Sequence, residues 1–329
     1  MKRKRQKESD LHWSEQKETV SSSRPIKLLL SLLKHLPNAV VNCLAYPVAF
    51  FYYLFSKRGR HESRVFQKKL KEFTNGEVPK IISPYKSILS LSIAFLEKLA
   101  GWLGKIEYDQ LITHDDDCQE LIERLEQGKG ALLFTSHLGN SELLRSLTSF
   151  NRTGVSKAIP VNVLMEIHAA EIFFQTLKEV NPGFTMNTID THDIGPETIE
   201  HMQECIDRGE LVVVAGDRTA ATSKEIFLRK KFLGQEADFP YGVYLIATLL
   251  EAPVYYIFGL RDKTTSINSK NHMYVERSKI DLNCTRKERE NKINALCDEF
   301  ISKIEHYCIQ YPYQWYNFYN FWLLSYEKD

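Results

Sequence analysis

The sequence lacks the cysteine and histidine spacings that mark zinc sites and CxxC redox motifs. Its six cysteines are spread along the 329 residues at Cys43, Cys118, Cys205, Cys284, Cys297 and Cys308. No two of them form a CxxC pair, and no cluster with histidine has zinc-ligand spacing. This pattern indicates dispersed reduced thiols in a cytosolic compartment. We therefore expect neither a metal nor a redox cofactor.

The chain also has little net charge, formally +1, but the charge is unevenly distributed. Residues 1–80 hold seventeen Lys and Arg against seven Asp and Glu, a charge of +10, so the remaining residues carry −9. A basic segment beside an acidic body suggests an anionic partner at the N-terminal end. A membrane surface fits better than nucleic acid, because the basic residues flank apolar sequence.

Long uninterrupted hydrophobic runs are missing too. The apolar stretch 26–55 is broken at Lys34, His35 and Pro37, and its second half, 39–55, contains Pro47. Seventeen residues are at the short limit for a membrane-spanning helix. No small-residue cleavage site follows the stretch, so the sequence does not predict a cleaved signal peptide.

A basic segment, 56–71, follows this stretch and carries apolar residues at Val65, Phe66 and Leu70. We interpret 26–71 as a helical hairpin or amphipathic element that lies in the cytoplasmic face of a membrane. Two alternatives remain: a single spanning helix, or two core helices of a soluble fold.

From about residue 117 the sequence alternates between strand-like and helical segments. Strands are expected at 131–136, 155–164, 184–190, 211–216 and 253–261, with 272–280 pairing with the last; helices are expected from about 141 and at 166–181, 195–209, 241–252 and 285–312, the last opening with a Thr285 cap. This order predicts an α/β fold with a mostly parallel sheet flanked by helices. We expect residues 1–80 to form a basic tail and a membrane-associating segment, and residues 81–329 to form the α/β domain.

The stretch LLFTSHLGNSELLRSL, residues 132–147, holds the first candidate catalytic group. His137 closely follows an apolar strand, Gly139 permits a sharp turn, and Asn140 or Ser141 can cap the next helix. Glu142 would lie in the first turn of that helix, from which it can fold back onto the imidazole of His137. Such a pair fixes the ring tautomer and stabilises the imidazolium during proton abstraction. The alternative is that His137 is a structural residue at a strand end.

Asp217 and Arg218 form the second candidate site. They follow the apolar strand 211–215 and Gly216, and should emerge at the same sheet edge as His137, where ligands of parallel sheets bind. Arg218 suits an anionic or polar part of a substrate. A purely structural ion pair is the alternative.

The loop-like stretch 232–242 is the third candidate site. Phe232 and Gly234 precede an apolar helix, and the segment is a candidate wall for an acyl chain.

The sequence motifs at these three sites, with a fourth near the C-terminus, together resemble those of a known family. SHLGNSE (136–142), AGDRT (215–219), FLGQEADFPYG (232–242) and YPYQWYNFYNFW (311–322) look like the lipid A biosynthesis acyltransferases, within the lysophospholipid acyltransferase group. The resemblance runs in order from about residue 12, where a His-Trp pair stands, to residue 322.

The resemblance implies an enzyme at the cytoplasmic face of a bacterial inner membrane. It would move an acyl chain from acyl carrier protein or coenzyme A to a hydroxyl of a lipid or glycolipid, without a metal. The family's catalytic pair falls on His137 and Glu142, and its Asp-Arg motif near substrate on Asp217 and Arg218. The segment 161–170 lacks the arginine of the lipid A enzymes, which suits another acceptor headgroup. A catalytically silent membrane accessory protein and a thioesterase remain alternatives.

In the expected mechanism, His137 deprotonates the acceptor hydroxyl, and backbone amides near Gly139 or Asn140 stabilise the oxyanion. Trp315, Phe318 and Trp322 have helical spacing and are expected to serve in core or interfacial packing.

Overall fold

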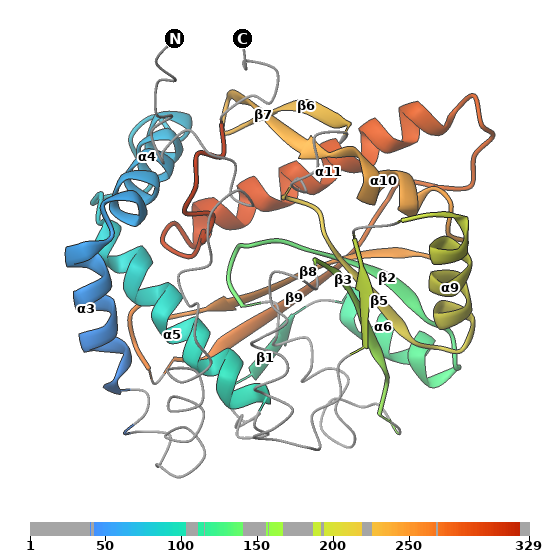
Figure 1. Ribbon diagram of the computed structural model, residues 1–329, viewed down its shortest axis with the longest axis horizontal. Helices are drawn as coiled ribbons and strands as arrows, with labels where there is room; N and C mark the ends of the chain where they lie inside the picture. Colours follow the sequence, from blue (N-terminus) through green and yellow to red (C-terminus); the bar gives the residue numbers. More distant parts are fainter. Residues whose placement is uncertain are drawn as a thin grey trace, which may run out of the picture.

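The computed structural model has an α/β architecture built around a mostly parallel seven-stranded sheet (Figure 1). It describes residues 40, 43–102, 111–114, 116–140, 156, 158–166, 187–191, 194–218, 226–267 and 269–322. The expected helix at 166–181 lies almost wholly outside these residues, as does the expected helix that begins near residue 141.

The strand order in the main sheet is β1-β9-β8-β2-β5-β3-β4. The strands are β1 Leu111–His114, β2 Ala131–Thr135, β3 Val161–Met165, β4 Asn187–Asp190, β5 Leu211–Ala215, β8 Val254–Arg261 and β9 Asn271–Arg277. All pairs are parallel except β8 with β9, which are antiparallel. The sequence-based expectation of a mostly parallel sheet, with the strand at 272–280 pairing with that at 253–261, is confirmed.

The central strands are apolar along most of their length because helices cover both faces of the sheet. Every residue of β2 and β8 is buried. One face packs against α9 Pro196–Asp207, α10 Tyr241–Ala247 and α11 Arg289–Gln310, and the other against α6 Asp116–Glu126. Leu132 and Phe134 point to the first face, while Ala131 and Leu133 point to the second, as strand geometry requires.

Three local expectations are corrected by the structure. Residues 232–240 are not a loop but most of an antiparallel hairpin, β6 Phe227–Phe232 with β7 Gln235–Pro240. Its two-residue turn, Leu233-Gly234, takes positive φ angles of 51° and 76°, the backbone geometry that matches strand twist. Helix α11 begins at Arg289, after a turn in which Thr285 donates a hydrogen bond to the Glu288 carboxylate, so Thr285 is not its cap.

The third correction concerns the aromatic C-terminal segment, 311–322, which is not helical. It runs in turns and extended backbone, and Trp315 makes an isolated antiparallel bridge with Leu138. Trp315 is 2% exposed, which confirms the expected packing role for this residue.

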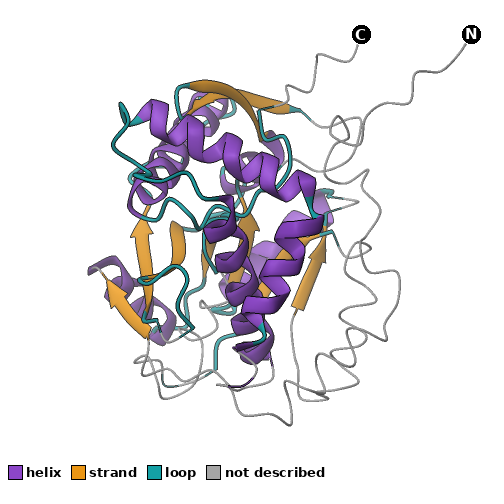
Figure 2. Ribbon diagram, turned by 90° about the vertical axis from the view of Figure 1, so that its left-hand side faces the viewer, coloured by secondary structure: helices purple, strands orange, loops and turns teal. Residues whose placement is uncertain are grey.

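Three helices stand at one side of the sheet: α3 Ala45–Phe55, α4 Lys57–Phe73 and α5 Pro84–Trp102 (Figure 2). Phe66 and Leu70 of α4 are buried in the protein core, and the Phe66 ring stacks on Trp315 at 5.6 Å. These two residues therefore belong to the core, as the alternative of core helices expects for this part of the segment. Among the described helices, none is both long enough and apolar enough to cross a membrane.

Candidate active site at the carboxyl edge of the sheet

The strand register brings His137 and Asp217 together. Strands β2 and β5 are parallel neighbours, and Thr135 pairs with Ala215 at their carboxyl ends. Two residues beyond this pair, a polar side chain follows each strand at the same edge of the sheet. His137 follows β2, and Asp217 follows β5. The nitrogen Nδ1 of His137 lies 3.0 Å from Oδ1 of Asp217. The carboxylate that orients the imidazole therefore comes from the neighbouring strand.

Asp217 is completely buried and its carboxylate accepts three hydrogen bonds. Besides the contact with Nδ1, Oδ2 accepts from the backbone N–H of His137 at 2.8 Å and from Nδ2 of Asn317 at 2.9 Å. Burial by itself raises the pKa of this carboxyl, but the interaction with His137 outweighs burial, and the pKa lies below its ordinary value of 3.8. Asp217 is therefore ionised and held in one orientation.

The imidazole of His137 is partly exposed, with 31% of its side-chain surface accessible. Burial, and next the nearby guanidinium of Arg218, lower its pKa below the ordinary value of 6.5, although Asp217 opposes them. The ring is thus neutral at neutral pH. With the Nδ1 proton directed to Asp217, Nε2 carries a lone pair, and no hydrogen bond from the described residues reaches it. This is the protonation state that a general base requires.

Asn317 links Asp217 to Arg218. Its amide nitrogen donates to Asp217, and its oxygen accepts a 2.8 Å hydrogen bond from Nε of Arg218. Asn317 is 2% exposed, so both bonds are shielded from water. The guanidinium of Arg218 also lies 5.5 Å from the ring centre of Tyr319. Reasoning from the sequence missed Asn317; its place in the motif QWYNF, residues 314–318, was the available signal.

The loop after β2 is clamped by the same C-terminal segment. The backbone N–H of Tyr316 donates to the carbonyl of His137 at 2.8 Å, and the N–H of Gly139 donates to Gln314 at 2.9 Å. Gly139 has φ 74°, and a Cβ atom there would lie 2.1 Å from the carbonyl oxygen of Gly259. Only glycine fits this position without a shift of the backbone.

Gln314 ties the C-terminal segment to the end of β8. Its side chain accepts from the N–H of Arg261 at 2.9 Å and donates to the carbonyl of Arg261 at 2.6 Å. The Arg261 guanidinium is itself buried and paired with Glu97 of α5. The loop after β2, the end of β8 and α5 are thus linked through Gln314 and Arg261.

The remaining predicted site residues fall at several places. Glu142 lies outside the described residues. The N–H of Asn140 donates to the carbonyl of Gly259 at 2.7 Å, and that of Gly139 is bonded to Gln314. Neither of these two amides is free to act as an oxyanion donor in this structure. The amides at the start of the expected helix after Asn140 lie outside the described residues.

Phe232 and Gly234 lie on the β6–β7 hairpin. The Phe232 ring is fully buried and contacts Trp315, Phe321 and Trp322, with ring centres 5.2 to 5.8 Å apart. Gly234 occupies the hairpin turn, near Phe73 of α4. In this structure the surface predicted to receive an acyl chain is covered by the protein's own aromatic side chains.

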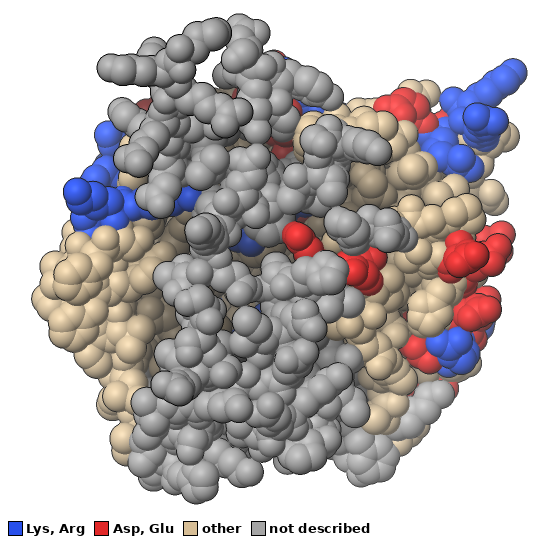
Figure 3. All heavy atoms as spheres, viewed as in Figure 1, with Lys and Arg blue, Asp and Glu red and all other residues tan. Residues whose placement is uncertain are grey.

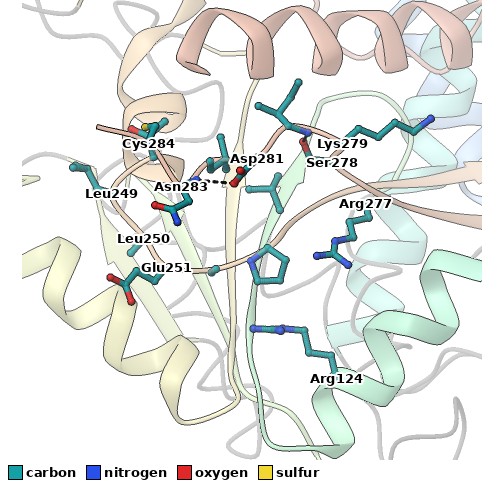
Figure 4. A pocket seen from close by; sticks show the side chains of 16 residues that line it. Arg124, Leu249, Leu250, Glu251, Arg277, Ser278, Lys279, Asp281, Asn283 and Cys284 are labelled. Carbon is teal, nitrogen blue, oxygen red and sulfur yellow. Dashed lines mark hydrogen bonds between the residues drawn. The ribbon is translucent and has the colours of Figure 1, made fainter. Parts of the chain in front are cut away.

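A large open pocket lies at the opposite edge of the sheet (Figure 4). It has a volume of about 910 Å³ and is lined at the amino end of β8 by Pro253 and Val254, with Arg124 and Arg277 pointing toward it. The pocket is separated from His137 by the length of the strands, so it is not part of the candidate active site.

Comparison with protein-family models gives no match, and no curated protein is detectably similar to the chain.

Proposed function

We propose that the protein is an O-acyltransferase that moves a fatty acyl chain from acyl carrier protein or coenzyme A to a hydroxyl of a membrane lipid or glycolipid. The observation that carries this proposal is the pairing of His137 with the buried, ionised Asp217 at the carboxyl edge of the sheet. The sequence motifs that resemble the lipid A biosynthesis acyltransferases supply the reaction class. Within these motifs His137, Asp217 and Asn317 form one hydrogen-bonded network, and the backbone of Gln314 and Tyr316 bonds the loop that carries His137.

In this proposal, Nε2 of His137 removes the proton of the acceptor hydroxyl as the oxygen attacks the thioester carbonyl. The C–O bond forms, the C–S bond breaks, and the proton on the imidazolium passes to the thiolate leaving group. Asp217 stabilises the imidazolium and holds the ring in the Nδ1–H tautomer. Asn317 is a positioning residue, because it acts through Asp217. The expected role of Glu142 stays a prediction, and Glu142→Ala tests it by loss of rate.

The test is lipid mass spectrometry of cells that express the wild type or His137→Ala and are fed a labelled fatty acid. A labelled lipid or glycolipid made only by the wild type supports the proposal, and its mass identifies the acceptor. Unchanged labelling in the variant would contradict it. Release of free labelled fatty acid without a labelled lipid would instead indicate a thioesterase, in which water is the acceptor. No difference of any kind would indicate an accessory protein.

A further inference from the structure

The pocket at the amino edge of the sheet has polar groups that the proposed reaction does not use. Its volume of about 910 Å³ lies within the usual range of small-molecule sites, about 300–1,000 Å³. Arg124, in the last turn of α6, and Arg277, at the end of β9, both line it. Figure 4 shows their guanidinium groups directed toward the same space. Two elements far apart in the sequence thus each contribute a cationic group to one end of the pocket.

Arg124 is held in a fixed orientation. Its Nε donates a 2.8 Å hydrogen bond to the carbonyl of Gly130. Its Nη1 and Nη2 make no hydrogen bond with any residue that the structure describes. Burial lowers the pKa of this guanidinium, and the positive charge of Arg277 lowers it further. Because an arginine still keeps its charge in a protein, Arg124 presents a cation with four unused N–H donors.

Arg277 is positioned by two carboxylates of α6. Its backbone N–H donates to Asp117 at 2.9 Å, and its Nη1 donates to Oε1 of Glu120 at 2.6 Å. The same oxygen of Glu120 accepts a 2.9 Å hydrogen bond from the hydroxyl of Tyr255. Nε and Nη2 of Arg277 have no hydrogen-bond partner among the described residues.

The two guanidinium groups share one carboxylate. Glu120 and Arg124 are four residues apart on α6 and therefore lie on the same face of the helix. Within the described part of the chain, Glu120 is the sole carboxylate that forms an ion pair with either guanidinium, and its partner is Arg277. Two positive charges and one negative charge leave this end of the pocket with a surplus of one positive charge.

The other end of the pocket carries hydrogen-bond acceptors. Glu251, before β8, and Asp281, after β9, line it and are exposed. Oδ1 of Asp281 accepts from the backbone N–H of Asn283 at 3.0 Å, which orients the carboxylate. Lys279 also lines the pocket, but Figure 4 shows its side chain extending away from the two guanidinium groups. The pocket therefore offers charged donors at one end and acceptors at the other.

We infer that this pocket binds a phosphorylated small molecule with hydroxyl or amino groups at its other end, the chemistry that mononucleotides and sugar phosphates share. The phosphate accepts from the unused N–H groups of Arg124 and Arg277, whose planar, forked donors match phosphate oxygens. Its negative charge balances the surplus positive charge. The hydroxyl or amino groups donate to Asp281 and Glu251. This site goes beyond the proposed function and does not depend on it.

The test is isothermal titration calorimetry of the purified full chain with adenosine 5′-monophosphate, glucose 6-phosphate, adenosine and inorganic phosphate. We expect a phosphate ester to bind, and the tighter of the two esters tells whether the site takes a nucleotide or a sugar. One hydrogen bond to a charged group contributes about ten- to a hundredfold in affinity. Adenosine, which lacks the phosphate, and inorganic phosphate, which lacks the rest, should therefore each bind at least about tenfold more weakly than the better ester.

Substitutions at both ends of the pocket test the assignment of its residues. Arg124→Gln/Arg277→Gln should weaken binding of the ester by about a hundredfold or more, because both charged donors are lost. Arg277→Gln alone should weaken it by about tenfold. The Arg277 side chain is 51% exposed, so this single variant keeps the fold and the test even if the double variant does not fold. Asp281→Asn should weaken binding of the ester but not of inorganic phosphate.

A matched control carries the same charge change on α4. Arg64 and Lys68 are exposed there, where Lys and Arg gather over α4 (Figure 3), on the other side of the molecule from the pocket. Arg64→Gln/Lys68→Gln should leave the affinity for the ester unchanged. His137→Ala should also bind the ester like the wild type, because the pocket lies at the opposite edge of the sheet.

No binding of either ester at millimolar concentration would overturn the inference. Equal affinity for adenosine and its monophosphate, or equal loss in the two double variants, would do the same. Inorganic phosphate bound as tightly as the esters would reject a site for phosphate esters. Loss of binding in His137→Ala but not in the arginine variants would place the ligand at the carboxyl edge instead. Loss of acyl transfer in His137→Ala bears on the proposed function alone, so the two proposals fail separately.

Discussion

The substitution Asp217→Asn tests the catalytic arrangement most directly. An asparagine at 217 has nearly the same shape, so its oxygen can keep the place that accepts from the His137 N–H and from Asn317. Its amide nitrogen then faces Nδ1 of His137, where a carboxylate oxygen now accepts. Two donors cannot face each other, so the imidazole must take the other tautomer, with the proton on Nε2. That nitrogen can no longer act as a base.

The size of the effect follows from this change of role. General acid–base catalysis contributes about 10²–10⁴-fold, so we expect the variant's maximal rate to fall within that range. The remaining influences on His137, burial and the Arg218 charge, both lower its pKa. In the wild type, activity should rise with pH through a pKa below 6.5, because the base must be neutral. In the variant this acid limb should move to still lower pH.

The assay is the rate of acyl transfer to the acceptor identified by mass spectrometry, measured from acid to neutral pH. Circular dichroism and thermal unfolding control for folding. An unchanged plateau rate in a folded variant would refute the assignment of Asp217. If Glu142→Gln abolished transfer while Asp217→Asn did not, the expected role of Glu142 as partner of His137 would be correct instead.

Three further substitutions test the packing around the site by urea unfolding. Gly139→Ala should lower the free energy of unfolding by about 2–3 kcal/mol, since the Cβ meets a backbone carbonyl at 2.1 Å and φ is positive; no loss would contradict the loop geometry. Gly242→Ala, in α10 with open space around it, should instead add about 0.5–1 kcal/mol; a loss would show a hidden contact. Asn317→Ala should cost about 1–3 kcal/mol, because Asp217 and Arg218 each lose a buried partner; an unchanged midpoint would argue against that bridge.

Much of the sheet could be predicted from local sequence. Runs such as 211–215 and 254–261 are short, apolar and bounded by turn residues, which is typical of buried parallel strands. Helix α9 begins after Gly195 at a proline, as its sequence indicates. The aromatic residues Trp315, Phe318 and Trp322 have the spacing of a helix, but their segment is not helical. Three residues at such intervals are weak evidence for a helix when tertiary contacts hold the segment in another conformation. Trp315 pairs with Leu138 across a separation that no local pattern reveals.

The sequence by itself determined that His137 and Asp217 each follow an apolar strand, and that the N-terminal region is basic and apolar. These are local properties of composition and periodicity. Only the tertiary structure decided that β2 and β5 are neighbours in register, so that His137 meets Asp217. It also decided that α4 turns Phe66 into the core and Arg64 and Lys68 outward. The reason is physical: strand order and helix orientation depend on which apolar surfaces can be buried together, and this is a property of the whole chain.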